Sequence, residues 1–355
     1  MAEVSIKLRG SRVAAILAGS WRRSPTSFEC SASELKDIAP LLINSGAAAL
    51  CWPRLKHSNL RKHPATAKFQ ETYRLNTLQS ALHQRAIEQT VALLRSAQIE
   101  PILVKGWCAA QLYPEPGLRP AGDIDLCVPP KQFASAQITL KNFQDEPYDV
   151  DLHEGFAKFG GGNFDQIYRR SQLAPLGETN VRVSGAEDHL RLLCIHMLRE
   201  GAWRPLWLCD IAAAVESLPE NFDWDCCLTE DRKLADWVIC AVRLAQQLLG
   251  ADITSTPIDQ RAKQIPRWLV PTILKEWGAP LPSMTQRHQA PMANFLRHPA
   301  GLLKALRHRW PNPIEATVNV RGSFNELPNL PFQLGDCLAR TAKFAARLLR
   351  SLRRE

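Results

Sequence analysis

The chain has 355 residues, of which 45% are hydrophobic and 22% charged, so it can bury a large core and fold as two or three packed units. No apolar run approaches the roughly 20 residues that a membrane-spanning helix needs. The ten cysteines are scattered without a Cys-x-x-Cys pair, which argues against a disulfide framework or zinc site and favours a reducing compartment.

The net charge of +9, from 44 basic and 35 acidic residues, is concentrated at the C-terminus. Residues 337–355 carry six basic side chains and one acidic side chain. The rest of the chain is modestly basic and shows no aromatic-basic platform, so we do not expect specific nucleic-acid binding. The apolar run 13–19 is short and precedes Trp21-Arg22-Arg23 instead of a cleavage site, which predicts a cytoplasmic protein.

The N-terminal part is predicted to be helical. Ser31 and Glu34 have the spacing of a capping box, followed by apolar residues at helical intervals, which predicts a helix that ends near residues 44–46. A long helix is expected over about 67–96, with Leu82 on its apolar stripe.

Short apolar segments, turns and helices are predicted to alternate after this long helix. The prolines that multiply after Thr254 predict broken helices there. In chain order we expect a strand over 101–104, a turn at Lys105-Gly106, a short helix over 107–112, a strand over 123–128, a helix over 131–141, a strand over 147–153 and helices over 187–250.

Two of the predicted strands carry carboxylates. Asp123 and Asp125 are two residues apart, so in a strand their side chains point to the same face. Such a pair suits Mg²⁺, a hard cation that takes oxygen ligands and keeps waters or substrate phosphates in its shell. Asp151 on the later strand would complete a three-carboxylate site that can hold two metal ions for displacement at phosphorus.

The order of these motifs resembles the polymerase-β-like nucleotidyltransferase superfamily, in which a glycine turn precedes Asp-x-Asp and a third Asp follows. The complete set of motifs is similar to that of one uncharacterised bacterial family within it, and the likeness covers roughly residues 30–250. The matching segments are Ile102-Leu103-Val104-Lys105-Gly106, Leu112-Tyr113-Pro114, Arg119-Pro120, Gly122-Asp123-Ile124-Asp125-Leu126, Val150-Asp151-Leu152-His153, Asp188-His189-Leu190, Cys194-Ile195-His196 and Trp207-Leu208-Cys209-Asp210.

The resemblance implies an α+β fold, with a small mixed-sheet nucleotidyltransferase core flanked by N- and C-terminal helical regions. The expected division is a helical region over 1–98, the core over 99–185, a helical region packing on the core over 186–255, and a proline-rich region with a basic amphipathic tail over 256–355.

The resemblance also implies a Mg²⁺-dependent transfer of a nucleoside monophosphate from a nucleoside triphosphate, such as ATP, to an acceptor hydroxyl. We expect a two-metal site, with Mn²⁺ as the alternative ion, and an acceptor that is a small molecule or a protein. Asp123, Asp125 and Asp151 are the expected metal ligands and catalytic residues, with Asp151 as general base and Asp149 as the alternative base. The expected substrate-binding residues are Lys105, Gly106, Arg119 and His153.

Several residues admit a second interpretation. Lys105 and Arg119 could bind phosphate or pair with a nearby structural carboxylate. His196 has the setting of a core histidine, and Asp210 is expected to pair with it or to cap a helix. The superfamily's usual Ser after the glycine is here Trp107, and the stretch between the carboxylate strands is short. These departures keep open a catalytically degenerate module that binds a nucleotide or a protein.

The C-terminal tail is predicted to form an amphipathic helix over 338–354. At 100° per residue, apolar residues fall on one side and basic residues on the other. The helix could dock its apolar face on the protein's own core, or it could contact an anionic membrane surface or an acidic partner through residues 337–355. The apolar side comprises Phe344, Ala345, Leu348, Leu349 and Leu352; the basic side comprises Arg340, Lys343, Arg347, Arg350 and Arg354.

Overall fold

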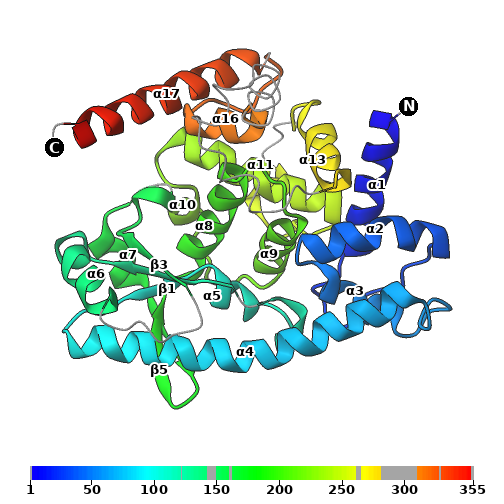
Figure 1. The fold of residues 1–355 in the computed structure, drawn as a ribbon, viewed down its shortest axis with the longest axis horizontal. Coiled ribbons are helices and arrows are strands. Elements are labelled where there is room, and N and C mark those ends of the chain that lie inside the picture. Colours follow the sequence, from blue (N-terminus) through cyan, green and yellow to red (C-terminus); the bar gives the residue numbers. More distant parts are fainter. Residues whose placement is uncertain are drawn as a thin grey trace.

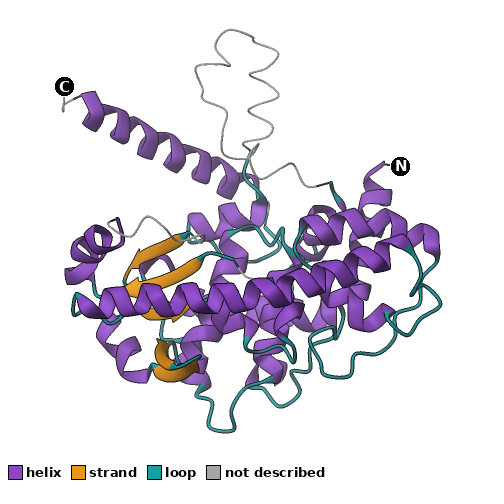
Figure 2. Cartoon of the chain, turned by 60° about the horizontal axis from the view of Figure 1, so that its bottom comes forward, coloured by secondary structure: helices purple, strands orange, loops and turns teal. Residues whose placement is uncertain are grey.

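The computed structural model describes residues 2–120, 122–141, 149–159, 162–260, 265–280, 310–327 and 329–352. Helices flank a five-stranded mixed sheet on both faces and form a large helical region beside it (Figure 1). Viewed by secondary structure, the strands are confined to one end of the molecule (Figure 2). This arrangement confirms the predicted α+β class.

The elements follow the predicted order through most of the chain. The helices are α1 (Ala2–Leu17), α2 (Ala32–Asn44), α3 (Ala48–Leu55), α4 (Pro64–Ser96), α5 (Gly106–Ala110), α6 (Phe133–Lys141), α7 (Phe164–Arg170), α8 (Ala186–Arg199), α9 (Pro205–Glu216), α10 (Trp224–Leu228), α11 (Arg232–Leu249), α12 (Pro257–Gln260), α13 (Leu269–Gly278), α16 (Pro313–Asn319) and α17 (Leu330–Leu352), with short 3₁₀ turns η1 (Pro116–Leu118), η2 (Pro130–Gln132) and η3 (Ala157–Phe159). The strands are β1 (Ile102–Val104), β2 (Ile124–Val128), β3 (Val150–Glu154), β4 (Gln172–Leu176) and β5 (Thr179–Val183).

The sheet has the strand order β3-β2-β1-β5-β4. Strands β2 and β3 are parallel and are joined through α6, whereas β1 is antiparallel to β2 and parallel to β5. The hairpin of β4 and β5 was not among the predicted elements. Pro175 weakens the strand signal of β4, although β5 alternates polar and apolar residues. The capping box of α2 formed as predicted, with Ser31 and Glu34 each bonding the other's backbone N–H.

The two faces of the sheet are covered by different segments. One face, with Leu103, Ile124 and Leu126, packs against apolar side chains of α4 and against α6. The other face presents Ile102, Val104 and Cys127 to the phenylalanines of 156–164 and to α8. Asp125 and His153 belong to this second face by the alternation of strand side chains.

Helix α4 runs beneath both the sheet and the N-terminal helices (Figure 1), and its buried side is partly polar. Leu82, expected on the apolar stripe, is exposed, while Asn76 and His83 are buried. Asn76 donates to the carbonyl oxygen of Gly117 at 3.2 Å. A Cβ at Gly117 would lie 2.6 Å from the carbonyl oxygen of Tyr73, so only glycine allows the loop before β2 to approach α4 this closely.

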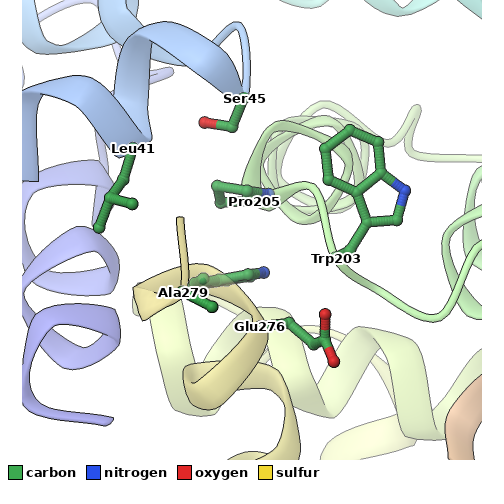
Figure 3. Close-up of a pocket in the computed structure, with 7 residues that line it drawn as sticks. Leu41, Ser45, Trp203, Pro205, Glu276 and Ala279 are labelled. Atoms are coloured by element: carbon green, nitrogen blue, oxygen red, sulfur yellow. The ribbon is translucent and has the colours of Figure 1, made fainter. Parts of the chain in front are cut away.

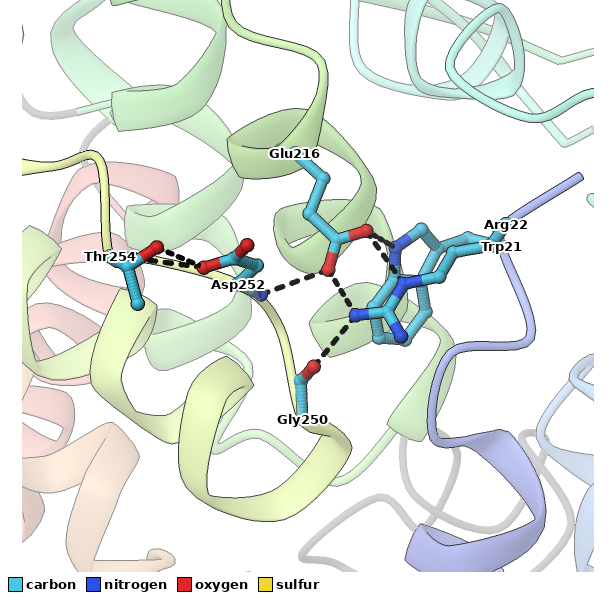
Figure 4. Close-up of polar contacts among 6 residues, drawn as sticks. All are labelled: Trp21, Arg22, Glu216, Gly250, Asp252 and Thr254. Atoms are coloured by element: carbon cyan, nitrogen blue, oxygen red, sulfur yellow. Dashed lines mark hydrogen bonds and ion pairs between the residues drawn. The ribbon is translucent and has the colours of Figure 1, made fainter. Parts of the chain in front are cut away.

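The chain segment after α1 is fastened to the helical region by Glu216 at the end of α9 (Figure 4). Its carboxylate accepts hydrogen bonds from Trp21 Nε1 at 2.9 Å and from Arg22 at 2.9 and 2.6 Å. Arg22 also donates to the carbonyl oxygen of Gly250, and the backbone N–H of Asp252 donates to Glu216. One carboxylate thus joins segments that are far apart in the sequence.

We expect Glu216→Gln to lower the free energy of unfolding by roughly 1–2 kcal/mol at neutral pH, because it removes charge-assisted hydrogen bonds. Burial raises the pKa of this carboxyl, but the hydrogen bonds from Arg22, Asp252 and Trp21 outweigh burial and lower it below 4.5. A lowered folded-state pKa means that the contribution is present above about pH 4.5 and is lost at lower pH. Urea unfolding should therefore show a difference between wild type and variant that shrinks below about pH 4.5; a difference that is constant with pH would contradict the assignment.

No helix in the part of the chain that the structure describes is long and apolar enough to cross a bilayer. All ten cysteines are free, and most are buried among apolar side chains. In the proline-rich C-terminal region, the described ranges contain the short helices α13 and α16 and the long helix α17, while residues 261–264 and 281–309 lie outside the described residues.

The predicted tail helix lies partly outside the described residues. The backbone of α17 continues to Leu352, whereas residues 353–355 and the side chains from 343 onward lie outside the described residues. Over residues 330–342, Leu330, Leu334 and Leu338 are exposed, so the structure does not show the expected docking of an apolar face on the protein's own core.

Candidate functional site

Strands β2 and β3 bring two of the predicted carboxylates side by side. Their register pairs Asp125 with Asp151 and Cys127 with His153. His153 Nε2 lies 3.1 Å from Asp125 Oδ1 and 3.3 Å from Asp151 Oδ2. One donor atom from each of Asp125, Asp151 and His153 falls within 4.8 Å of the others, so the three side chains form a single cluster.

His153 sits between the two carboxylates and is held there by its surroundings. Its side chain is buried, and its ring meets Phe159 edge to face at 4.7 Å. Nδ1 is buried without a hydrogen-bond partner among the described residues. The hydrogen-bond network therefore assigns the proton of a neutral imidazole to Nε2, which donates toward the carboxylates. His153 fixes how Asp125 and Asp151 face each other.

Lys105 reaches the same cluster from the end of β1. Its ammonium pairs with the carboxylate of Asp125 and lies 4.9 Å from the ring centroid of Phe159. Its backbone has φ 53° and ψ −119°, a conformation that costs a non-glycine residue about 1–3 kcal/mol. Lys105 thus adopts a strained backbone conformation in the turn between β1 and α5, and in this conformation its side chain reaches Asp125.

Asp123 and Asp149 lie beside the cluster, each one residue before its strand and exposed. Among the described residues, neither contributes to the donor atoms that converge within 4.8 Å. Gly106 follows Lys105, and a Cβ there would lie 3.4 Å from the carbonyl oxygen of Asp123. The structure thus brings Lys105, Gly106, Asp125, Asp151 and His153 together and leaves Asp123 at the edge.

The surroundings of Asp125 and Asp123 shift the pKa values of these two carboxyls in opposite directions. Burial raises the pKa of Asp125, but the His153 hydrogen bond and the Lys105 charge outweigh it and the pKa is lowered. Partial removal from water and the charge of Asp125 raise the pKa of Asp123. Of these two, Asp125 is therefore the carboxylate that is more firmly ionised, and Asp123 is the one whose charge is poorly compensated.

Comparison with known proteins bears on what such a site does. A model of the family described as uncharacterised nucleotidyltransferase matches residues 31–250. The chain belongs to this family. The match confirms the resemblance drawn from the motifs and covers both the sheet and most of the helices around it. No curated protein and no solved structure gave a match.

The carboxylates of the cluster in this family member fit a divalent cation. Asp125 and Asp151 supply carboxylate oxygens that lie, with a ring nitrogen of His153, within 4.8 Å of one another, a separation that ligands around one ion can have. His153 Nε2 donates to these carboxylates, so His153 positions the ligands and is not one of them. The ammonium of Lys105 already contacts Asp125, so a positive charge is accommodated at this point. Carboxylate oxygens suit Mg²⁺ or Mn²⁺.

Arg119 has a different place from Lys105. It is buried, and its guanidinium donates from Nε and Nη2 to the two oxygens of Asp210 at 3.0 Å and from Nη1 to the carbonyl oxygen of Pro120. Tyr113 also donates to Asp210, at 2.8 Å. Of the two roles left open for Arg119, the geometry matches the structural ion pair. The expected pairing of Asp210 with His196 is wrong, because the carboxylate of Asp210 binds Arg119 and Tyr113 instead.

Three neighbours of the site were not predicted. Burial lowers the pKa of His83, which hydrogen-bonds the backbone of Asp123 from α4. The ring of Phe159 contacts both Lys105 and His153. Tyr113 donates a hydrogen bond to Asp210, the carboxylate that also pairs with Arg119. A polar residue on the buried side of a long helix was the available signal for His83. His196 fits the core interpretation, since burial lowers its pKa to about 3 and its ring packs against Trp207 at 4.8 Å.

A shallow hollow elsewhere in the structure is separate from this cluster (Figure 3). It lies where the end of α2, the start of α9 and the end of α13 meet, and no carboxylate of the cluster lines it. Its lining residues are Leu41, Ser45, Trp203, Pro205, Glu276, Trp277 and Ala279.

Proposed function

We propose that the protein is a divalent-metal-dependent nucleotidyltransferase that moves a nucleoside monophosphate from a nucleoside triphosphate to an acceptor hydroxyl and releases pyrophosphate. The observation that carries the proposal is the convergence of Asp125, Asp151 and His153 on adjacent parallel strands. Membership of a nucleotidyltransferase family supports the reaction class.

The metal ligands in this proposal are Asp125 and Asp151, with Asp123 completing the set when the triphosphate brings its own cation. Bound there, Mg²⁺ or Mn²⁺ would neutralise triphosphate charge and polarise the phosphorus centre. The raised pKa of Asp123 indicates a carboxylate that would gain from a neighbouring cation. His153 keeps Asp125 and Asp151 in a fixed relation, so little reorganisation is required.

The chain's own residues account for the movement of atoms in the transfer. The acceptor oxygen forms a bond to the α-phosphorus while the bond to the bridging oxygen of the β-phosphate breaks, and pyrophosphate leaves. Asp151, whose side chain is 45% exposed, is reachable by an acceptor and takes the hydroxyl proton. Lys105 and the backbone at Gly106 lie beside the carboxylates, where they can bind the charged phosphates.

A catalytically degenerate module that binds a nucleotide or a protein is the second candidate. It is favoured by Trp107, which follows the glycine turn where the superfamily has Ser, and by the Lys105 ammonium that already neutralises Asp125. Such a module would not need a divalent cation to bind its ligand.

Metal dependence separates the two candidates. We expect α-labelled ATP, CTP, GTP or UTP, incubated with the protein, Mg²⁺ or Mn²⁺ and a cell extract, to transfer label to an acceptor with release of pyrophosphate. We expect EDTA to abolish the transfer and added Mg²⁺ or Mn²⁺ to restore it. Calorimetry with a non-hydrolysable triphosphate should show binding that requires the cation. Nucleotide binding that is equal with and without metal, together with no transfer, would instead identify the degenerate module.

A further inference from the structure

The basic side chains around the metal cluster differ in whether a carboxylate already neutralises them. Lys105 pairs with Asp125, and Arg119 donates to both oxygens of Asp210. Arg204, the residue immediately before α9, forms no ion pair within the described residues. Of these three cations, Arg204 is therefore the one whose charge is left for a ligand.

The guanidinium of Arg204 is held on one side and open on the other. Its Nε donates to the carbonyl oxygen of Ser45 at 2.7 Å, and its Cζ lies 5.9 Å from the ring centroid of Trp207. Neither Nη atom makes a hydrogen bond to a described residue, and neither is among the described polar atoms that are buried without a partner. The Nε contact thus fixes the side chain, while the Nη groups stay accessible to a ligand.

Arg204 lies on the side of the site where Asp123 is. Helix α9 packs against α5, the helix that follows Lys105 (Figure 1). A Cβ at Gly46 would lie 2.3 Å from Nη2 of Arg204 and 3.5 Å from Cγ of Pro120. Nη2 therefore comes close to the loop that runs from Pro120 to Asp123.

The surroundings of Arg204 leave its positive charge only partly compensated. Burial lowers the pKa of Arg204 to about 10, together with the charge of Arg119 and against the charges of Asp210 and Asp123. The guanidinium is thus charged at neutral pH. Asp210 already pairs with Arg119, so an anion that reached the Nη atoms of Arg204 would supply the missing compensation.

We propose that Arg204 binds the β- and γ-phosphates of the nucleoside triphosphate, the part that leaves as pyrophosphate. The inference rests on the function proposed above. The α-phosphate has to lie at Asp125 and Asp151, where the transfer takes place. Asp123 is the proposed ligand of the cation that accompanies the triphosphate, and such a cation bridges the β- and γ-phosphates. These phosphates therefore extend toward Asp123, the side on which Arg204 lies.

The chemistry of the side chain favours this ligand. A planar guanidinium with free Nη groups can donate two parallel hydrogen bonds to phosphate oxygens. A nucleobase would match the shape of the guanidinium but would leave its charge uncompensated. Arg204 thus takes the phosphate-binding role that the sequence suggested for Arg119, which is occupied by Asp210.

Calorimetry with the full chain and Mg²⁺ tests the proposal. The probes are the α,β-methylene analogues of ATP, CTP, GTP and UTP, the monophosphate of the base that binds most tightly, and inorganic pyrophosphate. Arg204→Gln should bind the triphosphate analogue and pyrophosphate about 10- to 100-fold more weakly, because charge-assisted hydrogen bonds are lost. Its affinity for the monophosphate, which has no β- or γ-phosphate, should stay within about twofold of wild type.

Two further variants separate phosphate binding from a structural role. Arg204→Lys keeps the charge without the fork, so it should bind the triphosphate analogue about three- to tenfold more weakly than wild type. Arg243→Gln is the matched control, because Arg243 of α11 also donates to backbone carbonyl oxygens, those of Ile258 and Asp259, at 2.8 and 3.0 Å. The control should bind every probe as wild type does, and melting temperatures report any loss of stability.

Two results would overturn the role of Arg204 and leave the proposed transfer in place. One is an affinity for the triphosphate analogue that is unchanged in whichever Arg204 variant folds. The other is an equal loss of affinity for triphosphate and monophosphate together with a lower melting temperature, which would make Arg204 structural. Wild-type protein that binds no triphosphate in the presence of Mg²⁺ would instead overturn the proposed nucleotidyl transfer, and the role of Arg204 with it.

Discussion

Asp125→Asn is expected to abolish nucleotidyl transfer in a protein that still folds but melts at a lower temperature, because the ammonium of Lys105 loses its counter-ion. Asp125 is the residue on which the site converges, since Lys105 and His153 both contact it and its register partner is Asp151. The amide keeps the shape but loses the charge that binds a cation. Loss of several kcal/mol of charge stabilisation corresponds to about 10²–10³-fold or more in rate.

The readouts for this variant are label transfer, Mn²⁺ binding followed by electron paramagnetic resonance, and the melting temperature. Glu154→Gln is the matched control, because Glu154 lies on the neighbouring strand β3, is exposed, and points to the face opposite Asp151 and His153. It should behave as wild type. Asp151→Asn should slow turnover more than it weakens nucleotide binding, as expected for a base. Transfer by Asp125→Asn within a few-fold of wild type would remove Asp125 from the mechanism.

The second large effect concerns stability. Asp210→Asn should lower the free energy of unfolding by about 3–5 kcal/mol, because it leaves the buried guanidinium of Arg119 without its counter-ion. Burial lowers the pKa of Arg119, but Asp210 outweighs burial and raises it, so the ion pair compensates for the loss of water around the guanidinium. Urea unfolding measures the loss.

A surface pair of the same geometry provides the control. Arg95 donates to both oxygens of Glu100, at 2.8 and 2.7 Å, but the two side chains are 32% and 29% exposed. Glu100→Gln should therefore cost at most about 1 kcal/mol. If Asp210→Asn fails to fold, the double variant Arg119→Met, Asp210→Asn should recover soluble protein, because it removes the stranded charge. Equal costs for Asp210→Asn and Glu100→Gln would show that burial does not govern this pair.

Local patterns were enough to predict many elements near the site. The capping box of Ser31 and Glu34 predicted the start of α2, and the apolar runs around 102–104 and 124–128 predicted β1 and β2. These signals are local, because a cap or a strand face depends on residues two to four positions apart. The hairpin of β4 and β5 was missed, because Pro175 interrupts the strand pattern of β4 and hides the alternation that β5 carries.

Leu82 shows why periodicity alone misassigned a helix face. The apolar pattern of α4 placed Leu82 inside, yet the loop before β2 brings its own polar backbone to α4. The buried positions are therefore held by Asn76 and His83, which bond that backbone. A buried carbonyl or N–H needs a partner, and which helix residue supplies it depends on where the loop lies.

The sequence by itself determined the α+β class, the family and the placing of carboxylates on two strands, because strand alternation and motif order are properties of neighbouring residues. Only the tertiary structure decided which of those carboxylates meet. The parallel register of β2 and β3 sets Asp125 beside Asp151 and leaves Asp123 at the edge. It also decided that Arg119 pairs with Asp210, 91 positions away in the sequence. The partner of a buried charge depends on which residues folding brings close in space, and the order of residues in the chain does not specify this.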